Sequence, residues 1–252
     1  MSTYPFRTAL VTGASAGIGE AIVRQLAADG VKTIVVARRA DRLEALAKEL
    51  PGVEVLVADV ANSSDIDRIV ARVAEVDLLV NNAGLGVHCK AANAPAHHFD
   101  NQVAVNIGAV VELSRAAAVA MTARRRGWIL NVSSVAGGIS TPDNAVYGAS
   151  KAFVTNFSDA LGLELKSSGV KVTALLPGYT HTEFHDVSGS PASEQGAPDW
   201  MWQTSSQVAE TALADAAAGR THSIPGVHNK VAVGLTRYIP RIVVNAVVSR
   251  SL

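Results

Sequence analysis

The chain has 252 residues, and its 22 basic and 22 acidic side chains give a formal net charge of zero. This balance argues against partners that need a strong positive field, such as nucleic acid, and the single cysteine, Cys89, excludes an intrachain disulfide. The length fits one α/β domain. Because no charged leader or long uninterrupted apolar run occurs, we expect a cytoplasmic protein without a membrane span.

Strand-like and helix-like segments alternate along the chain. Short apolar runs predict strands at residues 8–11, 33–37, 53–57, 77–80, 128–132, 170–176 and 221–225. Helical spacing of apolar residues predicts helices at residues 18–28, 41–50, 64–74, 95–124, 145–167 and 206–218. Strands this continuously apolar are typical of a parallel sheet buried on both faces. We therefore predict a single doubly wound α/β (Rossmann) domain over residues 1–252, with about seven strands and helices on both faces.

The regular alternation ends after Pro177. Residues 182–205 are rich in Ser, Gly, Pro and acidic side chains at first and then carry Trp200 and Trp202. We interpret this segment as a substrate loop whose tryptophans either cover a hydrophobic substrate or pack half-buried. The C-terminal extension, residues 227–252, is apolar with scattered arginines. It fits a subunit interface or a core-covering helix better than peripheral membrane contact.

A glycine-rich turn lies between the first strand and the first helix. It reads Gly13-Ala14-Ser15-Ala16-Gly17-Ile18-Gly19. Glycines let backbone N–H groups approach a phosphate closely, and the helix N-terminus adds a favourable partial charge. The spacing is Gly-x-x-x-Gly-x-Gly rather than the commonest dinucleotide pattern, and the alternative is a turn without a ligand. Its place after the first strand favours nucleotide binding.

The end of the second strand bears on which nucleotide binds. An acidic residue there would hold a ribose 2′-hydroxyl, but the chain reads Ala37-Arg38-Arg39. Guanidinium groups suit a 2′-phosphate by charge and by their forked donor geometry. We therefore favour NADP(H) over NAD(H). The alternative is that Arg38 and Arg39 only begin a solvated helix with Asp41 and Arg42.

Tyr147 and Lys151 are four residues apart, so on a helix they share one face. An ammonium beside a phenol stabilises the phenolate, and we expect it to lower the pKa of Tyr147. Ser134, thirteen residues upstream, adds a hydroxyl to the same small volume. Together these groups suit proton donation to a carbonyl oxygen, although such a pair also occurs on ordinary solvated helices.

Taken together, these motifs resemble those of the short-chain dehydrogenase/reductase family. The resemblance rests on motifs in the family's order and spacing over about residues 8–185: Thr12-Gly13-x-x-x-Gly17-Ile18-Gly19, Asp59-Val60, Asn81-Asn82-Ala83-Gly84, Asn106, Ser134, Tyr147-x-x-x-Lys151 and Pro177-Gly178. The C-terminal part lacks an Asp-Gly-Gly ending and is similar to the NADP-preferring branch of general ketoacyl and hydroxysteroid reductases. The resemblance therefore implies an oxidoreductase.

The resemblance also implies roles for individual residues. Four would be catalytic: Asn106, Ser134, Tyr147 and Lys151. The cofactor would be held by Gly13, Ser15, Ala16, Gly17, Ile18, Gly19, Arg38, Arg39, Asp59, Val60, Asn82, Ala83, Gly84, Tyr147, Lys151, Pro177, Gly178 and Thr182. Asn106 would hold a water that links Lys151 to solvent, although a plain structural hydrogen bond is its alternative. A homodimer or homotetramer is also implied.

The expected activity is NADP(H)-dependent interconversion of a ketone or aldehyde and an alcohol, on a hydrophobic 3-oxoacyl or steroid-like small molecule. The alternatives are a nucleotide-binding regulator with a vestigial site and a scaffold of the same fold. We expect no metal, because His181-Thr182-Glu183-Phe184-His185 lacks the glutamate that zinc proteases place directly after the first histidine.

Overall fold

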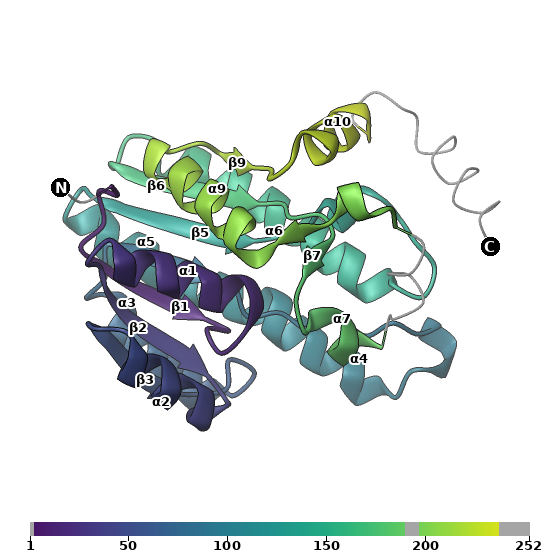
Figure 1. Ribbon diagram of the computed structural model, residues 1–252, viewed down its shortest axis with the longest axis horizontal. Coiled ribbons are helices and arrows are strands. Elements are labelled where there is room, and N and C mark those ends of the chain that lie inside the picture. The colour runs from purple at the N-terminus through teal and green to yellow at the C-terminus, as the bar shows by residue number, and fades with distance from the viewer. Residues whose placement is uncertain (1–2, 190–196, 237–252) are drawn as a thin grey trace.

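The computed structural model describes residues 3–189 and 197–236. Seven parallel strands form one sheet in the order β3-β2-β1-β4-β5-β6-β9 (Figure 1). They are β1 (Thr8–Thr12), β2 (Lys32–Ala37), β3 (Val53–Val57), β4 (Leu78–Asn81), β5 (Gly127–Val132), β6 (Val170–Leu175) and β9 (His222–Ser223). The predicted doubly wound fold is confirmed. The last strand is shorter than predicted, pairing with β6 only through its two residues.

Helices cover both faces of the sheet because successive strand residues point to opposite sides. Val11 lies in the cluster formed with α1 (Gly17–Ala28) and α9 (Ser205–Ala218), whereas Leu10 lies in the opposite cluster. That opposite cluster includes residues of α3 (Ser63–Val73), α5 (Ala109–Ala123) and α6 (Ala145–Glu164). The helix α2 (Ala40–Glu49) contributes Leu43 to the first cluster. Both clusters are buried, which explains the near-continuous apolar strands.

The strand order reverses between β1 and β4. From β1 the chain moves outward to β2 and β3, and it then returns to place β4 on the other side of β1. Loops that leave the carboxyl ends of β1 and β4 therefore diverge, which opens a crevice where ligands of such folds bind. This crevice is where the glycine turn and the Asn81-Asn82 segment meet.

The helix predicted over residues 95–124 is not regular. It consists of α4 (Ala96–Val103), a π-helical turn (Ala104–Gly108) and α5. Such turns insert one extra residue and often occur at functional sites. Within the described residues, the stretch His97–Ala123 is long and apolar enough to span a membrane by composition. Its buried residues, among them Leu113 and Met121, belong to the core of the domain.

The segment after β6 contains two short strands that the sequence did not predict. The two-residue strands β7 (Thr180–His181) and β8 (Gln203–Thr204) pair in parallel and join the two ends of the substrate loop. A short helix, α7 (Phe184–Ser188), follows β7. The helix α10 (Val227–Thr236) begins the C-terminal extension, and residues 237–252 lie outside the described part of the chain.

Candidate active site

Ser134 and Tyr147 meet at the carboxyl edge of the sheet. Ser134 follows β5, and Tyr147 lies in the first turn of α6. The Ser134 side chain lies beside that of Tyr147, where it acts to lower the pKa of the phenol. The Ser134 oxygen also accepts a hydrogen bond from the Ala136 backbone N–H at 3.1 Å, which fixes the side chain at the start of the short helical turn Val135–Gly138. The predicted pair of hydroxyl groups is therefore assembled and oriented.

Lys151 lies one helical turn after Tyr147 and is only 4% exposed. Its Nζ atom is 5.6 Å from the centroid of the Tyr147 ring and donates a hydrogen bond to the Val132 carbonyl oxygen at 2.8 Å. Burial lowers the pKa of Lys151 to about 8, because removing an ammonium from water disfavours its charged form. The side chain therefore titrates close to neutral pH.

The expected lowering of the Tyr147 pKa is wrong for this structure. Burial raises the pKa of Tyr147 to about 12, and the hydrogen bond from Ser134 opposes this increase only in part. The physical reason is that desolvation of the phenolate outweighs its stabilisation, while the Lys151 ammonium is directed at the Val132 carbonyl. The phenol of Tyr147 is therefore protonated at neutral pH.

Asn106 lies in the π-helical turn and is 1% exposed. Its Oδ1 atom accepts from the Leu85 N–H at 2.8 Å, and its Nδ2 atom donates to the Leu85 carbonyl at 2.8 Å and to Ser150 Oγ at 3.1 Å. A Cβ atom on Gly84 would lie 3.5 Å from Lys151 Nζ and 3.7 Å from Asn106 Oδ1. The structure therefore places Asn106 and Lys151 both beside Gly84. A water held by Asn106 that links Lys151 to solvent stays a prediction.

The glycine turn is braced from the neighbouring loop. Gly13 and Gly17 have φ of 64° and 59°, a conformation that favours glycine. Asn82 Nδ2 donates to the carbonyls of Thr12 at 2.9 Å and Gly13 at 3.1 Å. A Cβ atom on Gly19 would collide with that same amide group and with the Gly13 carbonyl. Only glycine fits here, so the close backbone turn that a diphosphate needs is present.

The two arginines after β2 diverge. Arg38 is directed toward Asp59, with its Nη1 atom 3.7 Å from Asp59 Oδ2. Arg39 donates from Nε and Nη2 to Ser15 Oγ at 3.1 and 3.0 Å, so it lies over the glycine turn. Arg42 joins it there, with its Nη1 atom 3.5 Å from the Ser15 carbonyl oxygen. The donors at this point fit an anionic group beside the turn, such as a ribose 2′-phosphate.

Arg42 was named from the sequence only in the alternative of a solvated helix and was not included among the cofactor residues. Its three-residue spacing from Arg39 at the start of α2 was the available signal, because residues three apart lie on one helix face. Glu183 was also missed. Its carboxylate binds Arg39 Nη1 at 2.8 Å and Arg42 Nη1 at 2.7 Å, and no local pattern indicated that contact.

The other predicted cofactor residues line the same edge of the sheet. Val60 comes after β3, whereas Ala16 and Ile18 belong to the glycine turn. The Ala83 N–H donates to Thr12 Oγ1 at 3.0 Å. The Pro177 carbonyl accepts from the Val135 N–H at 3.1 Å, which joins the ends of β5 and β6. Gly178 packs against Asn229, and Thr182 packs against Gly17. The predicted residues lie at or after the carboxyl ends of the strands, on one edge of the sheet, and their contacts with a cofactor stay predictions.

An aromatic cluster lies beside the catalytic groups. The Phe184 ring is 5.4 Å from the Tyr147 ring, and the Trp202 ring is 4.7 Å from His181 and 5.5 Å from His185. Both histidines of the discounted metal pattern thus pack against tryptophan. The other tryptophan, Trp200, is 67% exposed. The apolar wall near Tyr147 is therefore formed by Phe184, and Trp202 lies behind it.

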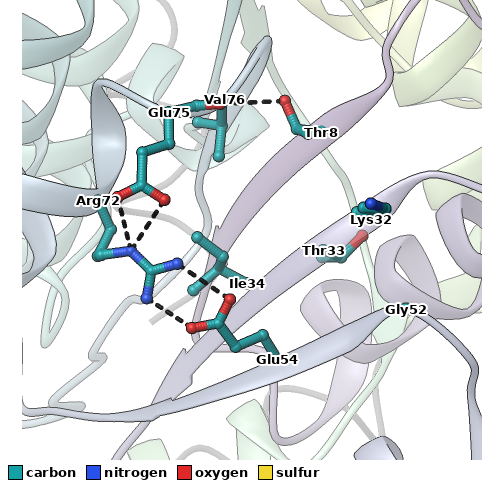
Figure 2. Close-up of a pocket in the computed structure, with 9 residues that line it drawn as sticks. All are labelled: Thr8, Lys32, Thr33, Ile34, Gly52, Glu54, Arg72, Glu75 and Val76. Carbon is teal, nitrogen blue, oxygen red and sulfur yellow. Dashed lines mark hydrogen bonds and ion pairs between the residues drawn. The ribbon is translucent and has the colours of Figure 1, made fainter.

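A pocket elsewhere on the molecule opens at the opposite edge of the sheet. Thr8, Lys32 and Gly52 line it at the amino ends of β1, β2 and β3. Figure 2 shows Arg72 held there between Glu54, at 2.6 Å, and Glu75, at 3.0 Å. The two glutamates satisfy the Arg72 guanidinium group within the domain. Because this pocket lies at the amino ends of the strands, it is separate from the Tyr147 site at their carboxyl ends.

The geometry agrees with the relatives of this chain. The family model described as short chain dehydrogenase matches residues 7–192. The chain is 40% identical over 186 residues to the NADP-dependent 3-hydroxy acid dehydrogenase YdfG of Salmonella typhi, covering 71% of this chain and 75% of that protein. It is 37% identical over 208 residues to the very-long-chain 3-oxoacyl-CoA reductase of Anas platyrhynchos, covering 76% of this chain and 65% of that protein.

A solved structure is similar over nearly the whole fold. The short-chain dehydrogenase from Sphingobium yanoikuyae in complex with NADPH superposes with a TM-score of 0.82 at 30% identity, covering 93% of this chain and 96% of that one. The fold and site thus define an oxidoreductase with a nucleotide-binding crevice. The chain belongs to the short-chain dehydrogenase/reductase family.

Proposed function

We propose that this protein is an NADP(H)-dependent oxidoreductase. It oxidises the CH–OH group of an alcohol to a carbonyl group, or catalyses the reverse reduction. The observation that carries the proposal is the Ser134 hydroxyl beside Tyr147 and buried Lys151, at the sheet edge that also holds the glycine turn. Tyr147 and Lys151 lie one helical turn apart on α6, and Ser134 comes from the end of β5, so a proton donor, a cation and an orienting hydroxyl lie together. A regulator with a vestigial site would not need this arrangement.

The nicotinamide, when bound, supplies the hydride for the carbonyl carbon. The hydroxyl groups of Ser134 and Tyr147 donate hydrogen bonds to the carbonyl oxygen and stabilise the negative charge that develops on it. Tyr147 then gives its proton to that oxygen. Lys151, when protonated, places a positive charge 5.6 Å from the centroid of the Tyr147 ring, while its ammonium donates to the Val132 carbonyl. In the reverse direction Tyr147 accepts the proton from the alcohol.

The preference for NADP(H) rests on Arg39 and Arg42. Both guanidinium groups lie over Ser15, where the 2′-phosphate of a dinucleotide would meet forked cationic donors. Arg38 is placed beside Asp59 at the predicted adenine end. The NADP-dependent relative and the NADPH-bound structure support this preference.

The substrate proposed is a hydrophobic 3-oxoacyl or 3-hydroxy acid compound, or a steroid-like ketone. Phe184 provides an apolar surface 5.4 Å from the Tyr147 ring, where an alkyl chain or fused ring could pack. Relatives described as a 3-hydroxy acid dehydrogenase and a 3-oxoacyl-CoA reductase support the first class.

Tyr147→Phe tests the reaction. The variant keeps the aromatic ring and loses only the hydroxyl, so NADPH affinity should survive while ketone reduction falls by about 10²–10⁴-fold, the usual contribution of a positioned acid. Tyr4→Phe is the matched control, because Tyr4 precedes β1 at the opposite edge of the sheet. Unchanged reduction by Tyr147→Phe would reject the proton-donor role. Binding of NADPH without reduction of any ketone by the unsubstituted chain would favour the vestigial regulator.

We also propose a cytoplasmic homodimer or homotetramer. Val119 on α5 and Leu163 on α6 are 66% and 73% exposed, and burial of these apolar side chains between subunits would favour association. Light scattering on the purified chain measures the assembly, and a monomeric mass would reject it.

A further inference from the structure

Three consecutive residues after β7 lie across three parts of the site. The Thr182 side chain packs on Gly17, where a Cβ atom would be 3.0 Å from Thr182 Cγ2. Glu183 binds Arg39 and Arg42. Phe184 packs near the Tyr147 ring at 5.4 Å. The start of the substrate loop therefore bridges the glycine turn, the anion site and the catalytic tyrosine.

The Glu183 contacts engage both oxygens of the carboxylate. Arg42 Nη1 donates to both carboxylate oxygens at 2.7 and 2.9 Å, and Arg39 Nη1 donates to Oε2 at 2.8 Å. The pKa of Glu183 is held below its usual range by its hydrogen bonds to Arg39 and then Arg42. The guanidinium groups thus hold an anion that belongs to the chain, at the place where an external anion would bind.

A ribose 2′-phosphate and the Glu183 carboxylate need the same donors. A phosphate monoester carries close to two negative charges at neutral pH and offers three acceptor oxygens, whereas a carboxylate carries one charge and offers two. Arg39 would still reach Ser15 through Nε and Nη2, while Nη1 of Arg39 and Nη1 of Arg42 already donate to Glu183. A 2′-phosphate beside the turn would meet the negative charge of Glu183 and compete with it for the same two guanidinium groups.

We propose that Glu183 is a specificity-determining residue whose carboxylate occupies the Arg39–Arg42 pair until a 2′-phosphate displaces it. This inference rests on the proposed NADP(H) preference. Glu183 is adjacent in the chain to Thr182, which packs on Gly17, and to Phe184, which packs near Tyr147. A dinucleotide with a 2′-hydroxyl carries no anion that would compete with Glu183 for Arg39 and Arg42.

Equilibrium binding to the full chain tests the inference without using activity. Glu183→Gln removes the competing anion while keeping the side-chain shape, so the Kd for NADPH should fall on the order of fivefold, the scale of exposed ion pairs. The Kd for NADH should change less than twofold. The fragments 2′-AMP and 5′-AMP, which lack the nicotinamide, should show the same contrast.

Glu49→Gln is the matched control. Glu49 is also an exposed carboxylate bound by one arginine, Arg24, through both oxygens at 2.6 and 3.0 Å, and it lies at the far end of α2. Its loss should leave all four affinities unchanged. A gain shared equally by NADPH and NADH in Glu183→Gln would indicate a general charge effect and overturn the inference, as would unchanged or weaker NADPH binding.

The unsubstituted chain separates this inference from the proposed function. If it binds 2′-AMP no better than 5′-AMP and NADPH no better than NADH, the cofactor preference fails and the inference fails with it. If the chain prefers the ligands with a 2′-phosphate, NADPH and 2′-AMP, but Glu183→Gln leaves that preference unchanged, only the role of Glu183 is rejected.

Discussion

Lys151→Met should stabilise the fold while abolishing the proposed chemistry. Lys151 is 4% exposed, and burial lowers its pKa from 10.5 to about 8. A pKa difference of one between the folded and unfolded chain corresponds to about 1.4 kcal/mol, so at pH 7 the buried ammonium costs about 3 kcal/mol. Methionine fills a similar volume without a charge, but it leaves the Val132 carbonyl without its donor, a loss of about 1 kcal/mol. A net gain of about 2 kcal/mol is expected.

The pH dependence identifies the cause of this gain. The folded-state pKa of Lys151 lies below its unfolded value, so between pH 8 and 10.5 the unfolded chain binds more protons than the folded chain. The unsubstituted protein therefore gains stability from Lys151 as the pH rises through this window. The advantage of Lys151→Met should be full at pH 7 and should shrink steadily toward pH 10.

Urea unfolding of both proteins at several pH values from 7 to 10 measures the difference. Lys166→Met, a change at an exposed lysine in the segment after α6, is the control and should stay within about 0.5 kcal/mol at every pH. A variant less stable than the parent at pH 7, or a difference that does not vary with pH, would refute the reasoning.

Further substitutions test how the site is supported. Asn82→Ala removes the amide that donates to the carbonyls of Thr12 and Gly13 and should cost about 1–3 kcal/mol in urea unfolding; a loss below about 0.5 kcal/mol would mean that water replaces the amide. Gly137→Ala would place a Cβ atom 2.7 Å from the Ala152 backbone nitrogen in α6 and should lower stability by about 1–3 kcal/mol, whereas Gly162→Ala within α6 meets only ordinary contacts at 3.6 Å and should raise it by about 0.5–1 kcal/mol. Equal effects of the two glycine changes would contradict the close approach of the Gly137 turn to α6.

The sheet was predictable because its inner strands, such as β1 and β4, are buried on both faces and so have apolar sequences of their own. The strand β1, with Leu10 and Val11 directed into opposite cores, illustrates this local signature. The positions of Ser134, Tyr147 and Lys151 followed from motif spacing. Each apolar strand and each motif can be recognised from a short stretch of sequence. The structure brings Ser134, Tyr147 and Lys151 together at the carboxyl edge of the sheet.

Other features depend on contacts between distant parts of the chain. The pairing of β7 with β8 involves two residues on each side, too few for a periodic pattern. The contact of Glu183 with Arg42 spans 141 residues. The pKa of Tyr147 depends on how deeply the folded protein buries its hydroxyl, and the motif contains no measure of that depth. Local sequence cannot report any of these three.

The π-helical turn at Ala104–Gly108 changes the phase of the helix that contains it. An α-helix advances about 100° per residue, so one additional residue rotates everything beyond it by about that angle relative to the part before it. The half before the turn can thus direct Gln102 to the Leu85 carbonyl, at 3.1 Å, while the half after it directs Leu113 and Met121 into the core. The requirements of the crevice and of the core are thereby separated within one helix, and either half can accumulate substitutions without setting the orientation of the other.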